Sequence, residues 1–209
     1  MPVIPTRKGA AVGRRPFFSC ARRSLILGLG ALLFGSVGAQ PPPAMPISSD
    51  RIALPPVRRE FTSPERSYLL VVENADQWKT SYPTARLYRT GQGQSVLCWT
   101  RVLTQQYGPR GAVVAGDGHV LFVDEWINVT SRWALVLVDV ENRVIATHDY
   151  KTAVGALAVS PAEIAAHARS GPWISDRPVL SADGKSARIA AGGRTLVVLL
   201  QDGSLSVAR

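Results

Sequence analysis

The 209-residue chain contains little cysteine and little histidine, which limits the metal and covalent chemistry available to it. It has two cysteines, Cys20 and Cys98, and three histidines at scattered positions. Two thiols cannot build a disulfide scaffold or a four-thiolate zinc site. The sequence also lacks a Gly-x-x-x-x-Gly-Lys phosphate loop and a Gly-x-Ser-x-Gly nucleophile elbow. We therefore expect no metal site and no cofactor.

Basic residues are numerous, but they form no block in the part of the chain that would fold. The net charge is +9, yet six of the 24 basic residues and none of the 15 acidic ones lie in residues 1–39. The remainder therefore carries a net charge of only +3, and its longest basic run is Arg58-Arg59. Nucleic-acid binding needs a concentrated cationic surface, so we expect no nucleic-acid partner.

Residues 1–39 have the three parts of an export signal. A basic start precedes the apolar run Leu25–Val37, and small residues follow it, so cleavage would leave Gln40 as the mature N-terminus. Arg14-Arg15 and the residues after it resemble a twin-arginine signal, although general secretory leaders also contain paired arginines. We predict a periplasmic or secreted protein. The alternative is an inner-membrane anchor that stays uncleaved, although the run is shorter than the ~20 residues of a usual span.

The rest of the chain divides into a linker and a β domain. Residues 40–66 hold seven prolines and predict an extended linker. Residues 67–209 contain β-branched runs of four to eight residues, separated by turn dipeptides such as Asp117-Gly118, and predict an all-β repeat domain of consecutive antiparallel meanders. The expected strands are 68–73, 85–89, 96–103, 112–115, 119–125, 133–140, 143–149, 179–180, 187–191, 195–200 and 205–207.

One segment departs from the β pattern and predicts a short helical insertion near residues 152–170. Ser160 can cap a helix, Pro161 suits its first position, and Glu163 can close a capping box. Gly171 follows the expected end of this helix. Residues 152–159 would add a further helical turn, so the insertion would lie between two meanders.

The β domain repeats a turn followed by a strand. Residues 63–72, 115–124 and 181–190 align residue by residue, and each copy leads to a second strand and then to a turn rich in Gly, Asp or Asn. This pattern resembles the blade repeat of bacterial WD-type β-propellers. The stretch Asp117–Trp126 also resembles a family of uncharacterised exported bacterial proteins, for which no activity is known. A closed propeller needs at least four blades, so three repeats predict an incomplete β-propeller. Either its sheets form an open twisted stack with exposed edges, or a second copy or another protein completes the structure.

Acidic and aromatic residues follow the first strand in two of the repeats. If the meanders stack in register, these residues gather on one rim, where tryptophan beside carboxylates would suit sugars, peptides or cationic ligands. The alternative is that the tryptophans fill the core and the acidic residues are solvated loop charges. The candidate binding residues are Glu73, Asn74, Trp78, Asp124, Glu125, Trp126 and Asn128.

These observations favour an exported, periplasmic, non-catalytic β-repeat module that binds an unidentified ligand or assembles with a protein. One alternative is a hydrolase that uses Glu73, Asp124 and Glu125, two of which would have to lie ~5 to 9.5 Å apart across a cleft. A second alternative is a membrane-tethered structural protein, with residues 25–39 as its anchor and 40–66 as its stalk. Membrane contact is expected only through this N-terminal segment.

Overall fold

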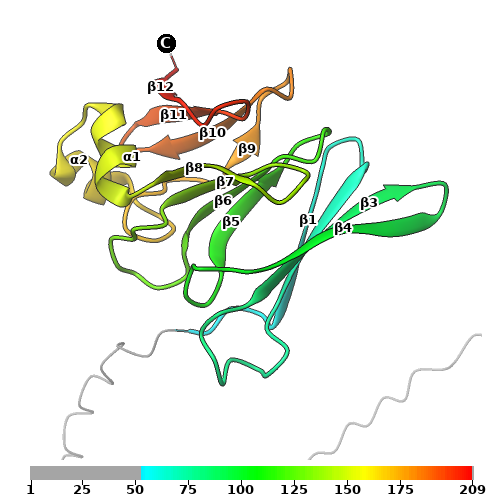
Figure 1. The fold of residues 1–209 in the computed structure, drawn as a ribbon. Helices are drawn as coiled ribbons and strands as arrows, with labels where there is room; N and C mark the ends of the chain where they lie inside the picture. Colours follow the sequence, from blue (N-terminus) through cyan, green and yellow to red (C-terminus); the bar gives the residue numbers. More distant parts are fainter. Residues whose placement is uncertain (1–52, 209) are drawn as a thin grey trace, which may run out of the picture. The chain divides into compact units, whose positions relative to one another are not determined.

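The computed structural model describes residues 53–208, so the predicted export signal and most of the predicted linker lie outside the described residues. The strands form three four-stranded antiparallel sheets, each built from four strands that are consecutive in the chain (Figure 1). We number these sheets 1 to 3 in chain order. This arrangement confirms the predicted all-β fold of consecutive antiparallel meanders with a short helical insertion.

The bounds of the strands are as follows. Sheet 1 contains β1 (Arg58–Thr62), β2 (Tyr68–Glu73), β3 (Thr84–Gly91) and β4 (Gln94–Val102). Sheet 2 contains β5 (Pro109–Val114), β6 (Val120–Glu125), β7 (Leu135–Val138) and β8 (Val144–His148). Sheet 3 contains β9 (Val179–Leu180), β10 (Ser186–Ala191), β11 (Arg194–Leu199) and β12 (Leu205–Val207).

The linker prediction is wrong at β1, which lies inside residues 40–66. This strand pairs antiparallel with β2, and Phe61 lies opposite Leu70. Phe61 packs against a buried cluster, while the exposed Arg58 and Glu60 alternate with it on the other face. Charged residues and flanking prolines are common on edge strands, and here they concealed the strand in the sequence.

The three predicted repeats correspond to the three sheets, but one repeat is shifted. The backbone N–H of Ser63 donates to Tyr68 O, and that of Ser181 donates to Ser186 O. In the second copy Ala115 N–H donates to His119 O, so this turn is one residue shorter. His119 rather than Val120 therefore corresponds to Tyr68, which corrects the residue-by-residue alignment made from sequence.

The sheets stack face to face, with sheet 2 in the middle. Phe122 of sheet 2 packs in one buried cluster with Leu70 of sheet 1. Leu121, the next side chain along β6, packs in a second cluster with Ile189 of sheet 3. Because both faces of sheet 2 are covered, β6 and β7 are buried along their whole length, and residues 120–123 and 135–138 are continuous apolar runs.

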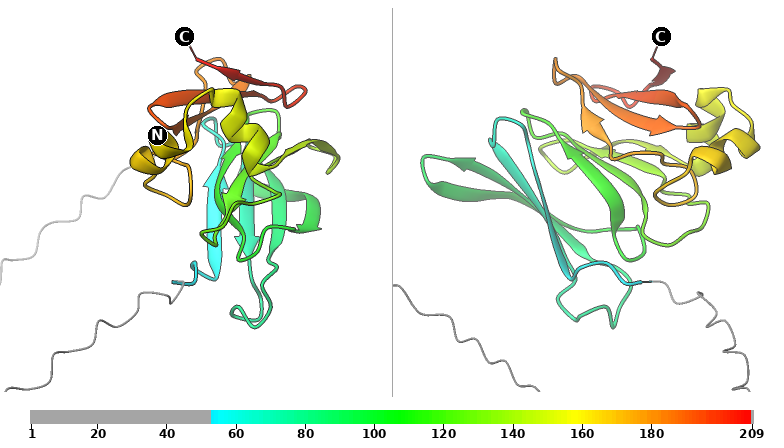
Figure 2. Two further views of the ribbon diagram at one scale, coloured as in Figure 1. Left: turned by 90° about the vertical axis from the view of Figure 1, so that its left-hand side faces the viewer. Right: turned by 180° about the vertical axis from the view of Figure 1, so that it is seen from behind.

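The first strands of the sheets lie side by side. β1 packs beside β5, and β5 beside β9, while the later strands of each sheet spread away from them (Figure 2). Every sheet therefore presents its first strand toward a common side of the molecule. This side holds the groove described in the next section.

The predicted helical insertion is present between β8 and β9. It comprises α1 (Tyr150–Leu157) and α2 (Pro161–His167), and α2 has the predicted capping box between Ser160 and Glu163. Leu157 and Ile164 bury their side chains in the cluster between sheets 2 and 3. Within residues 53–208, no helix is both long and apolar enough to cross a membrane.

Candidate functional site

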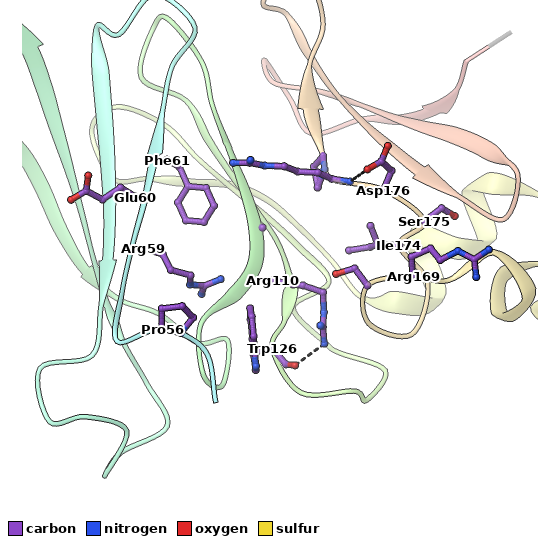
Figure 3. Close-up of a pocket in the computed structure, with 14 residues that line it drawn as sticks. Pro56, Arg59, Glu60, Phe61, Arg110, Trp126, Arg169, Ile174, Ser175 and Asp176 are labelled. Atoms are coloured by element: carbon purple, nitrogen blue, oxygen red, sulfur yellow. Dashed lines mark hydrogen bonds between the residues drawn. The ribbon is translucent and has the colours of Figure 1, made fainter. Parts of the chain in front are cut away.

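A groove of about 550 Å³ lies where the first strands of the three sheets come together (Figure 3). β1 forms one wall, β5 the floor, and the segment that leads into β9 the other wall. Its apolar lining includes Pro56, Phe61, Trp126, Ile174 and Pro178, and its basic lining comprises Arg59, Arg110, Arg169 and Arg177. Glu60 and Asp176 also line it, so the groove combines four guanidinium groups, two carboxylates and apolar walls.

Trp126 separates two of these arginines. The guanidinium carbon of Arg59 lies 5.1 Å from the centroid of the Trp126 ring, and that of Arg110 lies 5.6 Å from it. The two arginines approach the ring from opposite sides (Figure 3). Both contacts are cation–π interactions, which hold flexible side chains in one geometry. Trp126 therefore positions two cations at the same end of the groove.

Neither guanidinium is fully satisfied by the described residues. Arg110 Nη2 donates to Trp126 O at 2.6 Å and to Asn128 Oδ1 at 2.9 Å, but Arg110 Nε has no hydrogen-bond partner. Arg59 Nη2 is buried and also has no partner. An unsatisfied buried donor costs roughly 1 to 3 kcal/mol. Arg110 Nε lies beside Asp124 and Gly171, and Arg59 Nη2 lies beside Gly108 and Val72, so both atoms are enclosed by the chain itself.

The two arginines also disfavour each other's charge. Burial, with a smaller contribution from the charge of Arg110, lowers the pKa of Arg59 to about 10. Burial likewise lowers the pKa of Arg110, although the nearby Asp124 opposes this change. Both groups are cationic at neutral pH, and an anion bound beside them in the groove would offset their charge.

Asp124 lies behind Arg110 and has no exposure to solvent. Its Oδ2 is 3.9 Å from Arg110 Nε, and neither carboxylate oxygen accepts a hydrogen bond from a described residue. Burial raises the pKa of Asp124 to about 7, and the charge of Arg110 only partly opposes this effect. A Cβ at Gly171 would approach Asp124 Oδ2 to 2.8 Å, so only glycine lets this segment close over the pair.

The structure brings three of the predicted site residues to this groove. Trp126 lines it, Asn128 accepts a hydrogen bond from Arg110, and Asp124 lies behind that arginine. These three residues follow one another at and beyond the end of β6. They belong to a cationic groove rather than to the acidic rim expected from sequence.

The other four predicted residues make contacts elsewhere. Asn74 is buried, and its Oδ1 accepts a hydrogen bond from Trp78 N at 2.7 Å. Glu125 is buried and accepts one from Ser131 Oγ at 2.7 Å. Glu73 forms an ion pair of 3.1 Å with Arg86. These bonds hold loops and strand ends in place, which is a structural role for Asn74 and Glu125.

The two predicted tryptophans both donate a hydrogen bond to the same segment of the chain, residues 53–55. Trp78 Nε1 donates to Pro55 O at 2.8 Å, and Trp126 Nε1 donates to Ala53 O at 2.6 Å. The loops that follow β2 and β6 therefore converge at the same end of sheets 1 and 2. They hold residues 53–55 beside the groove, and the next residue, Pro56, lines it.

Sequence reasoning missed Arg59 and Arg110. Arg59 stands in a basic doublet of the predicted linker. Its alternation with Phe61 was the available signal that this segment forms a strand. Arg110 stands in a Gly-Pro-Arg-Gly stretch just before the expected strand 112–115. Their approach to Trp126 depends on how sheets 1 and 2 stack, so no local pattern could reveal it.

Comparison with known proteins gives little. No family model matches the chain, and no curated protein matches it. Among solved structures, a europium-containing methanol dehydrogenase is similar with a TM-score of 0.34 and 10% sequence identity. The match covers 68% of this chain and 23% of that protein, so the chain spans less than a quarter of the length of that neighbour. A likeness this weak carries no argument about function.

Proposed function

We propose that this chain is an exported, non-catalytic binding module that takes an organic anion in the groove between β1, β5 and β9. The observation that carries the proposal is the pair of cationic side chains, Arg59 and Arg110, held on both sides of Trp126 in the lining of the groove. Guanidinium groups bind carboxylates and phosphates through charge-assisted hydrogen bonds. Binding an oxyanion in the groove would offset the charge of both groups and relieve their mutual repulsion.

The walls of the groove favour a ligand with an apolar body. Phe61, Ile174 and Pro178 line the part between the arginines and the β9 segment. An inorganic anion would leave these surfaces in contact with water, whereas an aromatic or aliphatic acid would cover them. The ligand class that fits both features is a carboxylic acid with a compact hydrophobic group.

The positions of the acidic residues favour a binding role over hydrolysis. None of Glu73, Asp124 and Glu125 lines the groove. Asp124 has the raised pKa that a catalytic acid needs, but its side chain has no exposure through which a substrate could reach it. A carboxylate hydrolase needs two such groups facing one cleft, and these three do not provide that arrangement at the groove.

The repeat architecture supports the proposal that the chain is a binding module. Four strands in meander order are the composition of a propeller blade, and the chain contains three such units. Binding residues are often carried by loops on a rigid scaffold. The groove includes Trp126 from the loop after β6 and the segment that leads into β9.

Calorimetric titration of the full chain with sodium benzoate at constant ionic strength tests the binding proposal. We expect saturable binding with one site per chain. Arg59→Gln and Arg110→Gln should each weaken the affinity at least tenfold, because each removes one charge-assisted contact. Arg132→Gln removes an exposed charge outside the groove and should leave the affinity unchanged. Equal affinities for the wild type and Arg59→Gln would contradict the proposal.

The export part has its own test. N-terminal sequencing of the protein from the periplasmic fraction of an exporting bacterial host should find Gln40 as the first residue. Recovery of the chain from membranes with residues 25–39 intact would instead favour the anchored alternative. This result would not affect the binding measurement, so the two parts of the proposal can fail separately.

A further inference from the structure

The groove is longer than a compact acid requires. A second hollow of about 300 Å³ shares Phe61 and Pro178 with the hollow at Arg59 and Arg110, so the two form one continuous groove. Its floor extends along β5 from Arg110 to Val114, which is roughly 14 Å at ~3.4 Å per residue. Benzoate would occupy only the end that holds the arginines.

The floor of this groove is the free edge of β5. β5 is the first strand of its sheet, and sheets 1 and 3 cover the two faces of that sheet. In an antiparallel pair, alternate residues direct their backbone groups toward the partner strand. The backbone N–H of Ala115 donates to His119 O, so Val113 also faces β6. Ala112 and Val114 therefore direct their N–H and C=O groups toward the free edge.

These edge groups lack partners in the part of the chain that the structure describes. Ala112 and Val114 are buried, yet no described residue hydrogen-bonds their backbone groups. Buried backbone groups are nearly always paired in folded proteins. The other two first strands offer less, because β1 carries the exposed charges of Arg58 and Glu60 and β9 has only two residues. The edge of β5 is therefore the one best suited to pair with an added strand.

The arginines fix the direction of such a strand. β5 runs from Arg110 toward Val114, so a peptide that pairs antiparallel with it ends beside Arg110. Its terminal carboxylate would then meet the guanidinium groups of Arg59 and Arg110. A parallel strand would instead bring its N-terminal ammonium group to the same two cations. Charge therefore favours an antiparallel strand with a free C-terminus.

The two carboxylates in the lining do not neutralise this end of the groove. Glu60 Oε1 accepts a hydrogen bond from Arg58 Nη2 at 2.7 Å. Asp176 Oδ1 accepts one from the backbone N–H of Arg177 at 2.7 Å. Among residues 53–208, neither carboxylate forms an ion pair with the two arginines beside Trp126. These arginines stay available to a carboxylate brought by a ligand.

The walls suit the side chains of an extended peptide. Successive side chains of a strand point in opposite directions, here toward sheet 1 and toward sheet 3. They would meet Phe61 on one wall, and Ile174 and Pro178 on the other. The last residue of the peptide would lie between these walls with its carboxylate at the arginines. An apolar C-terminal residue thus fits the groove best.

We infer that the ligand is the C-terminal segment of an extended polypeptide, which adds to the free edge of β5 as an antiparallel strand. This inference rests on the proposed anion site and specifies the class of its ligand. Backbone hydrogen bonds to Ala112 and Val114 supply affinity, whereas Arg59 and Arg110 select a free carboxylate. A polypeptide without a free C-terminus at this position is excluded by the loss of that charge.

Calorimetric titration of the full chain with the pentapeptide acetyl-Ser-Val-Thr-Val-Phe, with N-acetylphenylalanine and with benzoate tests the inference. We expect the pentapeptide to bind roughly tenfold more tightly than N-acetylphenylalanine, which is too short to reach Ala112 and Val114. The C-terminal amide of the pentapeptide should bind roughly tenfold more weakly than the free acid. Equal affinity of the free acid and its amide would overturn the selection of a chain end.

The small acids separate the two levels of the proposal. If benzoate binds and the pentapeptide binds no better than N-acetylphenylalanine, strand addition is refuted while the anion site stands. If neither benzoate nor N-acetylphenylalanine binds, the proposed function fails, whatever the pentapeptide does.

Methylation of single peptide nitrogens tests the pairing itself. Alternate N–H groups of an added strand face β5, so of two pentapeptides methylated at the nitrogen of threonine or of the valine after it, only one should lose affinity, by roughly tenfold. The other is the matched control, because its methyl group points away from β5. Equal losses in the two methylated peptides, or no loss in either, would refute an antiparallel strand at this edge.

Discussion

Arg110 Nε lies 3.9 Å from Oδ2 of Asp124, close enough for electrostatic attraction but too far for a hydrogen bond. The carboxylate is fully buried, and no described residue donates a hydrogen bond to it. The attraction does not compensate for the loss of water, and so burial raises the pKa of Asp124 to about 7. A group behind the groove therefore changes charge near neutral pH.

This raised pKa predicts how stability depends on pH. Unfolded Asp124 ionises near its ordinary pKa of 3.8, whereas the folded chain keeps its proton up to about pH 7. Between these values the folded state binds more protons than the unfolded state, so the free energy of unfolding falls as pH rises. We expect the contribution of Asp124 to fall by roughly 3 kcal/mol between pH 5 and pH 8.

Urea unfolding of the wild type and of Asp124→Asn across this pH range measures the effect. Asparagine tolerates the left-handed backbone of this position, where φ is 56°, and it does not titrate. As pH rises, the free energy of unfolding of Asp124→Asn should increase relative to that of the wild type. Parallel profiles would show that Asp124 ionises normally in the folded chain.

Ligand affinity should depend on the same proton. When Asp124 is ionised, its charge competes with the ligand for Arg110. We expect the affinity for benzoate to fall about fivefold between pH 6 and pH 8, a range in which benzoate itself stays ionised. Calorimetry with Asp124→Asn should find an affinity that is nearly constant with pH. A wild-type affinity that increases with pH would contradict the assigned role of Arg110.

Trp126 should matter more for binding than for folding. Trp126→Ala removes both cation–π contacts, so the affinity for benzoate should fall more than tenfold, while stability falls by about 1 to 2 kcal/mol because the side chain is only partly buried. Tyr82→Ala is the control: it removes an exposed aromatic side chain that does not line the groove and should bind benzoate normally. A stability loss of roughly 3 to 5 kcal/mol in Trp126→Ala would instead indicate a core residue.

The stacking of sheets 1 and 2 can be tested at two equivalent turns. Gly118 and Gly184 both have positive φ, of 92° and 70°. A Cβ at Gly118 would lie 2.7 Å from Val140 and 3.0 Å from Tyr68 of sheet 1, whereas a Cβ at Gly184 meets nothing within 4 Å. Gly184→Ala should cost about 1 kcal/mol, and Gly118→Ala roughly 1 to 3 kcal/mol more. Equal losses in thermal unfolding would argue against this packing.

The parts of the fold that were predictable depend on local chemistry. The capping box of Ser160 and Glu163 marks α2 within a few residues, and β2 begins and ends where its apolar run does. β1 has no such run, because its place in the sheet comes from pairing with β2 across a turn. The shifted second repeat was also invisible, since a turn shortened by one residue leaves the apolar pattern of β6 intact.

The groove could be predicted only in part. Trp126 and Asn128 were found because loops after repeated strands tend to gather at one end of a stack. Arg59 and Arg110 lie on first strands of different sheets and become neighbours only when the sheets pack. Four arginines line the groove that Trp126 reaches, whereas the sequence predicted a rim of acidic and aromatic residues.

The most direct test of the anion site is a nuclear magnetic resonance titration of the full chain with sodium benzoate. We expect the side-chain Nε–H signals of Arg59 and Arg110 and the indole N–H signal of Trp126 to shift with one common dissociation constant. The indole signal of Trp78, which binds the same linker segment outside the groove, should stay in place. Unchanged arginine signals, or equal shifts of both indoles, would contradict binding between Arg59 and Arg110.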